Sequence, residues 1–140
     1  MNFQYAAQEK FSALKENYAK VQALRERFWN ALCREYFVRL SDETTSPYIL
    51  SLSAKGLRGE IVLHMSEDKG LLIGTGSACS SNSKNRYSKV ILAMGYDEKT
   101  ADGLIRISFS SDTTEAETDE AAQILNAVVK ELRERMNIKD

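Results

Sequence analysis

Residues 47–70, "PYILSLSAKGLRGEIVLHMSEDKG", decide the fold that the sequence predicts. Pro47 marks the entry to a strand, YILSLSA, which Lys55 and Gly56 close. The rest of the stretch fits a helix that ends at Gly70. A strand that leads directly into a helix indicates a fold in which helices cover a sheet.

Upstream of this stretch we expect one long helix and one short strand. Apolar residues recur at three- and four-residue steps along the first third of the chain, which predicts a helix with its apolar face against a sheet or another helix. They are Phe11, Leu14, Tyr18, Val21, Leu24, Phe28 and Leu32, with Trp29 on that face or at its edge. YFVRLSD then predicts a short strand, and DETTSP, residues 42–47, a turn.

Downstream we expect further short elements and a final helix. Residues 71–76, LLIGTG, predict a brief strand, residues 88–95, SKVILAMG, a helical turn or two, and residues 97–103 another turn. GLIRISFS, residues 103–110, alternates well enough to be a strand. Residues 111–136 form a capped helix with acidic residues early and basic residues late.

This order predicts a single α+β domain, residues 1–140, with no linker rich enough in Gly or Pro to divide it. We expect a small three- or four-stranded, mostly antiparallel sheet with helices packed on one side.

Composition narrows the function classes. Hydrophobic residues make up 43% and charged residues 28%, as in an ordinary globular domain. The 19 basic and 20 acidic residues give a net charge of −1, so no nucleic-acid or membrane partner is expected. No apolar run approaches the roughly 20 residues that span a bilayer, and the first residues lack the order of a signal peptide, which predicts a cytoplasmic protein. Two cysteines and one histidine predict neither a disulfide framework nor a metal site.

The most distinctive stretch is GTGSACSSNSKNRYS, residues 74–88. A lone cysteine is usually a small buried apolar residue, which fits Cys33 inside the first predicted helix. Cys79 has small, polar neighbours instead, and the nearby Lys84, Arg86 and Lys89 favour its thiolate form. Cys79 is therefore a candidate nucleophile.

Other residues leave two interpretations open. Gly74 and Gly76 suit either a tight turn or a backbone nest that binds an anion. Arg106 lies among apolar residues of a predicted strand, where it either faces solvent or grips a carboxylate with two parallel hydrogen bonds. We expect His64 to be structural, and the acidic residues from Asp112 to Glu120 to serve the helix start.

Four segments together resemble a known family: GEIVLHMSEDKGLLIGTGSACSS, SKVILAMG, ADGLIRISFS and TTEAETDEAAQIL. They are similar to the C-terminal small domain of cysteine desulfurases of the NifS/IscS-like branch of the class V aminotransferases. The resemblance implies the small domain of a fold-type-I enzyme that depends on pyridoxal phosphate. Such enzymes take sulfur from L-cysteine as a cysteine persulfide, leaving L-alanine, for iron–sulfur cluster or thio-cofactor synthesis.

The resemblance also implies roles for three residues. Cys79 matches the persulfide-forming nucleophile, and Arg106 matches the arginine that binds the substrate α-carboxylate. Thr75 matches the residue that reaches the cofactor phosphate of the partner subunit in a homodimer. The residues after Cys79 resemble the loop that delivers the persulfide to a sulfur-acceptor or scaffold protein. Gly74 departs from the family, which often has serine there, and Lys89 from its frequent histidine.

The large domain of the family, which holds the cofactor lysine, has no counterpart in this chain. We therefore expect the isolated chain to bind no cofactor and to be inactive on its own. An alternative is a free-standing, non-catalytic module that binds a partner or accepts sulfur. A thiol redox sensor built on Cys79 is less favoured, because no resolving cysteine lies near it in the sequence.

Overall fold

The computed structural model describes residues 3–40, 47–74 and 92–138, with side chains from residue 14 onward. Its elements follow an α+β order, as predicted. They are α1 (Phe3–Ala31), a 3-10 turn η1 (Arg34–Tyr36), β1 (Phe37–Arg39), β2 (Ile49–Ala54), α2 (Gly59–Asp68), α4 (Glu98–Asp102), β3 (Leu104–Ser108) and α5 (Glu115–Arg135).

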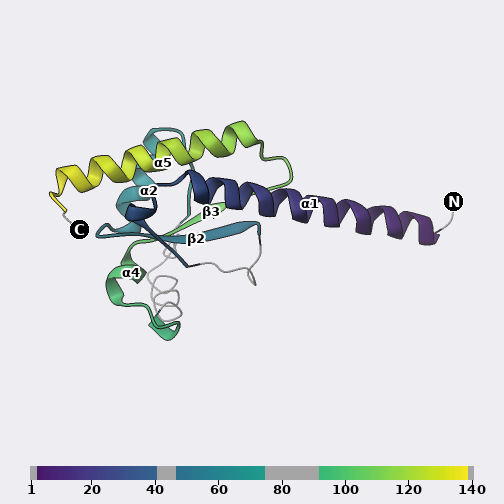
Figure 1. Cartoon of the computed structure of the whole chain (residues 1–140), viewed down its shortest axis with the longest axis horizontal. Coiled ribbons are helices and arrows are strands. Elements are labelled where there is room, and N and C mark those ends of the chain that lie inside the picture. Colours follow the sequence, from purple (N-terminus) through teal and green to yellow (C-terminus); the bar gives the residue numbers. More distant parts are fainter. Residues whose placement is uncertain (1–2, 41–46, 75–91, 139–140) are drawn as a thin grey trace.

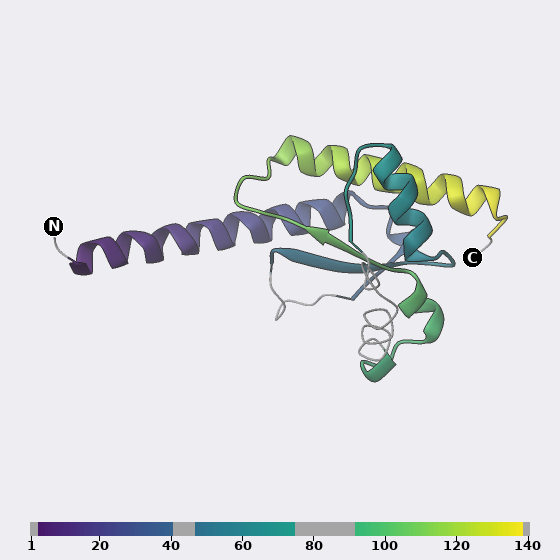
Figure 2. The same cartoon turned by 180° about the vertical axis from the view of Figure 1, so that it is seen from behind.

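The three strands form an antiparallel sheet in the order β1-β2-β3. The long helices α1, α2 and α5 lie on one face of this sheet, and the short α4 lies on the other side (Figures 1 and 2). This arrangement confirms the predicted small antiparallel sheet with helices packed on one side, with the short α4 as an exception.

The core lies between the sheet and the long helices. Leu50 and Leu52 of β2 and Ile105 of β3 are fully buried there against α1 and α5. The helices contribute Val21, Leu24, Phe28, Leu125, Val128 and Val129 to the same cluster. Because strand side chains alternate between faces, the neighbours of these residues in β2 and β3 point the other way.

Side-chain hydrogen bonds join α5 to α1, and to the residues that follow α1, at two places along their contact. Arg27 donates two hydrogen bonds of 2.8 Å to the Asp119 carboxylate, and this pairing lowers the pKa of Asp119. Asn126 accepts a hydrogen bond from the backbone N–H of Cys33 and donates one to the carbonyl of Ala31. Since α1 ends at Ala31, the prediction that Cys33 lies inside the helix was wrong: the half-buried Cys33 follows it.

The predicted burial along α1 is only partly confirmed. Val21, Leu24, Phe28 and Leu32 are buried, but 63% of Leu14 and 46% of Tyr18 are exposed. The reason is the length of the helix: its N-terminal part runs beyond the sheet and α5, so no described element covers these side chains (Figure 1). The Phe11 side chain lies outside the described part.

The predicted strand at residues 71–76 was too long. The N–H of Leu71 still bonds the carbonyl of Ser66 at the end of α2, and among residues 71–74 only Gly74 pairs with the sheet, in an isolated bridge to Arg106. Thr75 and Gly76 lie outside the described residues. The bridge places Gly74 on the edge of the sheet beside β3.

Two further expectations change in detail. Residues 97–103 contain the short helix α4 rather than a turn, and Asp97 caps this helix by accepting a 2.8 Å hydrogen bond from the N–H of Thr100. A hydrogen bond from the Thr100 hydroxyl lowers the pKa of Asp97 the most, and the bond from the Thr100 N–H lowers it further. His64 is an exposed residue of α2, 4.0 Å from Glu67. The turn predicted at 42–47 and the start of the segment at 88–95 lie outside the described residues, apart from the buried Pro47.

Candidate functional site

Arg106 lies in the middle of β3, on the face of the sheet opposite the long helices. Its neighbours Ile105 and Ile107 point into the core beneath α1 and α5. Alternation therefore directs Arg106 to the other face, where it is half-buried. An arginine on this face is not needed for the main core, and a guanidinium is a side chain that can recognise a planar anion such as a carboxylate.

The strand on one side of Arg106 presents a small residue. Ser51 of β2 is the register partner of Arg106, and the Ser51 carbonyl bonds the N–H of Leu40 on the far side. The backbone groups of Arg106 bond Gly74 instead, so Ser51 and Arg106 form a non-hydrogen-bonded pair. Facing side chains of such pairs lie closest together, so the small Ser51 side chain lies directly beside the stem of Arg106.

On its other side Arg106 is joined to the start of the distinctive stretch. The N–H of Gly74 donates to the Arg106 carbonyl at 2.8 Å, and the N–H of Arg106 donates to the Gly74 carbonyl at 2.7 Å. Thr75 follows Gly74 directly, and Cys79 comes five residues after Gly74. Covalent geometry alone limits the Gly74–Cys79 separation to about 16–18 Å.

Thr75 and Cys79 themselves lie outside the described residues. Their roles therefore remain predictions. The structure does bring the first residue of GTGSACSS next to Arg106, although the two are 32 positions apart in the sequence.

Two glycines that the sequence analysis missed hold β3 in place. A Cβ atom on Gly59 would lie 2.2 Å from the carbonyl oxygen of Leu104, and one on Gly103 would lie 2.5 Å from the carbonyl oxygen of Ala54. Ser53 adds a hydrogen bond of 2.7 Å from its hydroxyl to the Thr100 carbonyl. The strand that carries Arg106 is thus clamped between α2, α4 and β2 by close backbone approach.

We expect Gly59→Ala to destabilise the chain by about 1–3 kcal/mol. Alanine normally favours a helix over glycine, but here its Cβ would collide with backbone that cannot rotate away. Urea unfolding measures the effect. The matched control is Gly74→Ala, whose Cβ would meet Arg106 at an ordinary 3.8 Å and should change stability by less than about 0.5 kcal/mol. Equal unfolding midpoints for the two variants would contradict the claim that close backbone approach at Gly59 holds β3 in place.

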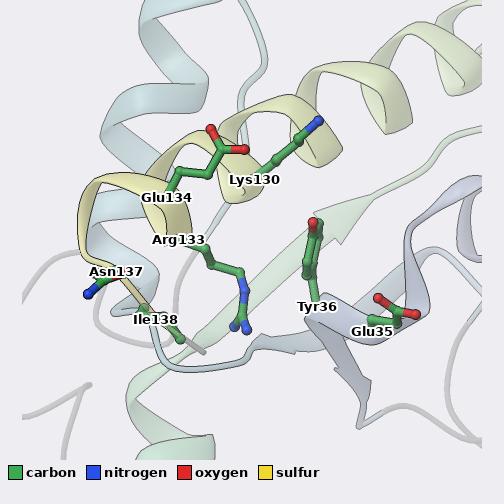
Figure 3. A pocket seen from close by; sticks show the side chains of 7 residues that line it. All are labelled: Glu35, Tyr36, Lys130, Arg133, Glu134, Asn137 and Ile138. Carbon is green, nitrogen blue, oxygen red and sulfur yellow. The ribbon is translucent and has the colours of Figure 1, made fainter. Parts of the chain in front are cut away.

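One polar hollow of the described part lies at the end of α5, and its lining does not include Arg106. A hollow of about 390 Å³ lies between the end of α5 and η1, lined by Glu35, Tyr36, Lys130, Arg133, Glu134, Asn137 and Ile138. In Figure 3 the Arg133 and Tyr36 side chains face each other, and the guanidinium lies 5.2 Å from the ring centroid. Arg133 also donates a 2.6 Å hydrogen bond to the Lys55 carbonyl. These contacts fasten α5 to the β2–α2 turn and indicate a structural role.

No family model matches the chain. Curated relatives do. The cysteine desulfurase IscS of Pseudomonas putida strain F1 is 37% identical over 118 residues, which cover 83% of this chain and 28% of that protein. IscS of Proteus mirabilis is 33% identical over 132 residues, covering 90% and 32%. A cysteine desulfurase of Sinorhizobium fredii is 30% identical over 132 residues, covering 92% and 34%.

The chain is a homologue of part of the cysteine desulfurases. It spans about a third of the length of the curated relatives it matches. Two solved structures share the fold: a NifS-like protein with a TM-score of 0.70 and 24% identity, and a NifS-like protein from Rickettsia africae with a TM-score of 0.58 and 20% identity. The matched regions cover 86% and 88% of this chain, respectively, and 30% of each of the two solved chains.

On the Arg106 face, described residues of this desulfurase homologue line a small hollow. The hollow found there is lined by Val38, Ser53, Lys55, Gly56, Asp97, Lys99 and Thr100 and measures about 160 Å³. Small-molecule sites are typically about 300–1,000 Å³. This hollow by itself is therefore too small for pyridoxal phosphate. The same residues hold no group of three or more His, Cys, Asp or Glu that could bind a metal, and none of their helices is long and apolar enough to cross a membrane.

Proposed function

We propose that residues 1–140 form the C-terminal small domain of a cysteine desulfurase that depends on pyridoxal phosphate. The homology supports the family, and the bridge between Gly74 and Arg106 is the observation that carries the proposal. The bridge joins the strand with the candidate carboxylate ligand to the segment with the candidate nucleophile. Two parts of one active site would need such a connection.

Arg106 is proposed to bind the α-carboxylate of L-cysteine. Its guanidinium can donate two parallel hydrogen bonds to a carboxylate, which fixes the orientation as well as the position of the substrate. Its strand is held by the close approach of Gly59 and Gly103, so the arginine starts from a rigid base. Its register partner on β2 is the small residue Ser51.

Cys79 is proposed to take the sulfur. Its thiolate attacks the sulfur of L-cysteine, and an S–S bond forms as the bond between that sulfur and the substrate Cβ breaks. The electron pair of the broken bond stays with the substrate carbon, which gains a proton to give L-alanine, and Cys79 keeps the sulfur as a persulfide. Pyridoxal phosphate, when bound, supplies the electron sink that this chemistry requires.

The cofactor itself is proposed to be held mainly by the two thirds of the relatives' length that this chain does not cover. Thr75 would add a hydrogen bond to the cofactor phosphate of the partner subunit in a homodimer. The persulfide would pass to a sulfur-acceptor or scaffold protein, in the cytoplasm, for iron–sulfur cluster or thio-cofactor synthesis.

We expect the isolated chain to bind pyridoxal phosphate no better than an unrelated protein with a similar number of lysines. The reason is that the cofactor lysine and the ring contacts of the family belong to the large domain, which this chain does not cover. Absorbance spectra and borohydride trapping followed by peptide mapping provide the measurement. Stoichiometric trapping at one defined lysine would contradict this expectation.

The proposed function is tested by complementation. The P. putida desulfurase, cut before the region that matches this chain, is mixed with the chain, pyridoxal phosphate and L-cysteine, and sulfide and alanine are assayed. We expect both products only when both polypeptides are present. If the chain accepts sulfur from an intact desulfurase but never supports alanine formation, the alternative of a sulfur-accepting module is the correct one.

Cys79 should be alkylated faster than Cys33. Cys33 is half-buried and follows α1 directly, whereas three basic residues near Cys79 in the sequence favour its reactive thiolate. Timed iodoacetamide labelling of the native chain, with mass spectrometry of each cysteine peptide, measures the two rates. Equal rates, or faster labelling of Cys33, would remove the argument that Cys79 is an activated thiol.

A further inference from the structure

A second surface lies on the helix side of the sheet, away from Arg106. It is a groove of about 380 Å³ between the segment after α2, the end of β3 and the first turns of α5. Its lining includes Leu71, Leu72, Phe109, Glu117 and Glu120. None of the roles proposed above uses this groove.

The floor of the groove is apolar and buried. Phe28 and Phe109 form it, with ring centroids 5.7 Å apart in an edge-to-face contact, and both are almost fully buried. Leu71 and Ile124 pack against the same core and remain partly open. At the lip stands Leu72, which is 80% exposed, more than any other large apolar side chain in the described part. A partner that covered Leu72 would remove this apolar surface from water.

The rim of the groove has an excess of acid. Glu117 and Glu120 line it from α5, with Lys69 as the single cation among the lining residues. Glu117 accepts a hydrogen bond from the Thr114 hydroxyl at 3.0 Å as part of the helix cap. Glu120 is exposed and makes no ion pair within the described ranges. Its charge is therefore available to a partner.

We propose that this groove binds a segment of a partner polypeptide in which a large aliphatic side chain lies next to a lysine or arginine. The aliphatic group would pack on Leu72 and the phenylalanine floor, and the basic group would pair with Glu120. A second copy of this chain fits less well, because a symmetric contact would bring the two acidic rims together. This docking site is independent of the desulfurase chemistry.

The test uses the isotope-labelled chain and three synthetic peptides. The first is an amphipathic peptide of leucine and lysine, the second has glutamate in place of lysine, and the third has serine in place of leucine. Backbone NMR spectra are recorded during titration. We expect only the leucine–lysine peptide to bind, with shifts concentrated at Leu72, Glu120 and Ala121.

Matched variants distinguish binding of the peptide in this groove from nonspecific attraction of a basic peptide to acidic surface. Glu120→Lys should weaken binding by about fivefold or more, whereas Glu16→Lys, at another exposed acid, should change it little. Leu72→Ser should weaken binding, and Leu14→Ser, at another exposed leucine, should not. Equal effects of the paired variants, binding of the glutamate peptide, or an absence of shifts in the groove would each overturn the proposal.

Discussion

Replacing Cys79 by serine is expected to reduce sulfide release from L-cysteine in the complemented enzyme by about three orders of magnitude or more. A serine hydroxyl at neutral pH is a far weaker nucleophile toward sulfur than a thiolate, and it cannot form a persulfide. The assay follows sulfide and alanine together after addition of a reducing thiol. The fold should not change, which circular dichroism can establish.

The second cysteine provides the control for this experiment. Cys33 lies beyond the end of α1, where its backbone N–H bonds Asn126 and its side chain is half-buried. Cys33→Ser should therefore retain activity within about a factor of two. If Cys79→Ser keeps full activity, or if the two variants lose it equally, Cys79 is not the nucleophile.

Replacing Arg106 by alanine should reduce kcat/KM for L-cysteine by about 30- to 1,000-fold, equivalent to about 2–4 kcal/mol of lost transition-state binding. The loss follows from removal of a charge-assisted, two-pronged contact to the substrate carboxylate. Arg106→Lys should restore only part of it, because an ammonium keeps the charge without the planar fork.

The matched control for Arg106 is Arg58→Ala, because Arg58 is an exposed arginine at the start of α2. This variant should have unchanged kinetics. Unfolding midpoints for Arg106→Ala and Arg58→Ala should lie close together, since Arg106 projects from the sheet face opposite the main core. Unchanged kcat/KM in Arg106→Ala would mean that the arginine does not contact substrate.

The sequence predicts most helices and strands of this fold because local signals and tertiary contacts agree. Thr114 caps α5 by accepting from the N–H of Glu117, and the acidic and basic ends of that helix are visible in the sequence. The strand around Arg106 is likewise predicted from its alternation. The Arg106 side chain points to the sheet face opposite the long helices because its neighbours Ile105 and Ile107 face those helices.

Two of the wrong predictions arise because an apolar pattern in the sequence does not show what lies against it. Leu14 and Tyr18 continue the stripe of α1 but extend past the described body of the protein. Leu72 lies in an apolar run that resembles a strand, although among the described residues 71–74 only Gly74 pairs with the sheet. No local pattern could reveal the clamp at Gly59 and Gly103 either, because it depends on carbonyls distant in sequence.

The connection between GTGSACSS and Arg106 was also beyond the reach of local patterns. Residues 74 and 106 meet only because Gly74 adds to the edge of β3. The family resemblance suggested one site for both, and the bridge gives this suggestion a physical basis in two backbone hydrogen bonds.

The measurement that tests the proposed function most directly is mass spectrometry of the Cys79 peptide. The chain, the cofactor-binding part of a relative, pyridoxal phosphate and L-cysteine are incubated without reductant, and thiols are then blocked with an alkylating agent. We predict that the Cys79 peptide gains the mass of one sulfur atom, while the Cys33 peptide does not. A Cys79 peptide that gains no sulfur while alanine accumulates would contradict the account.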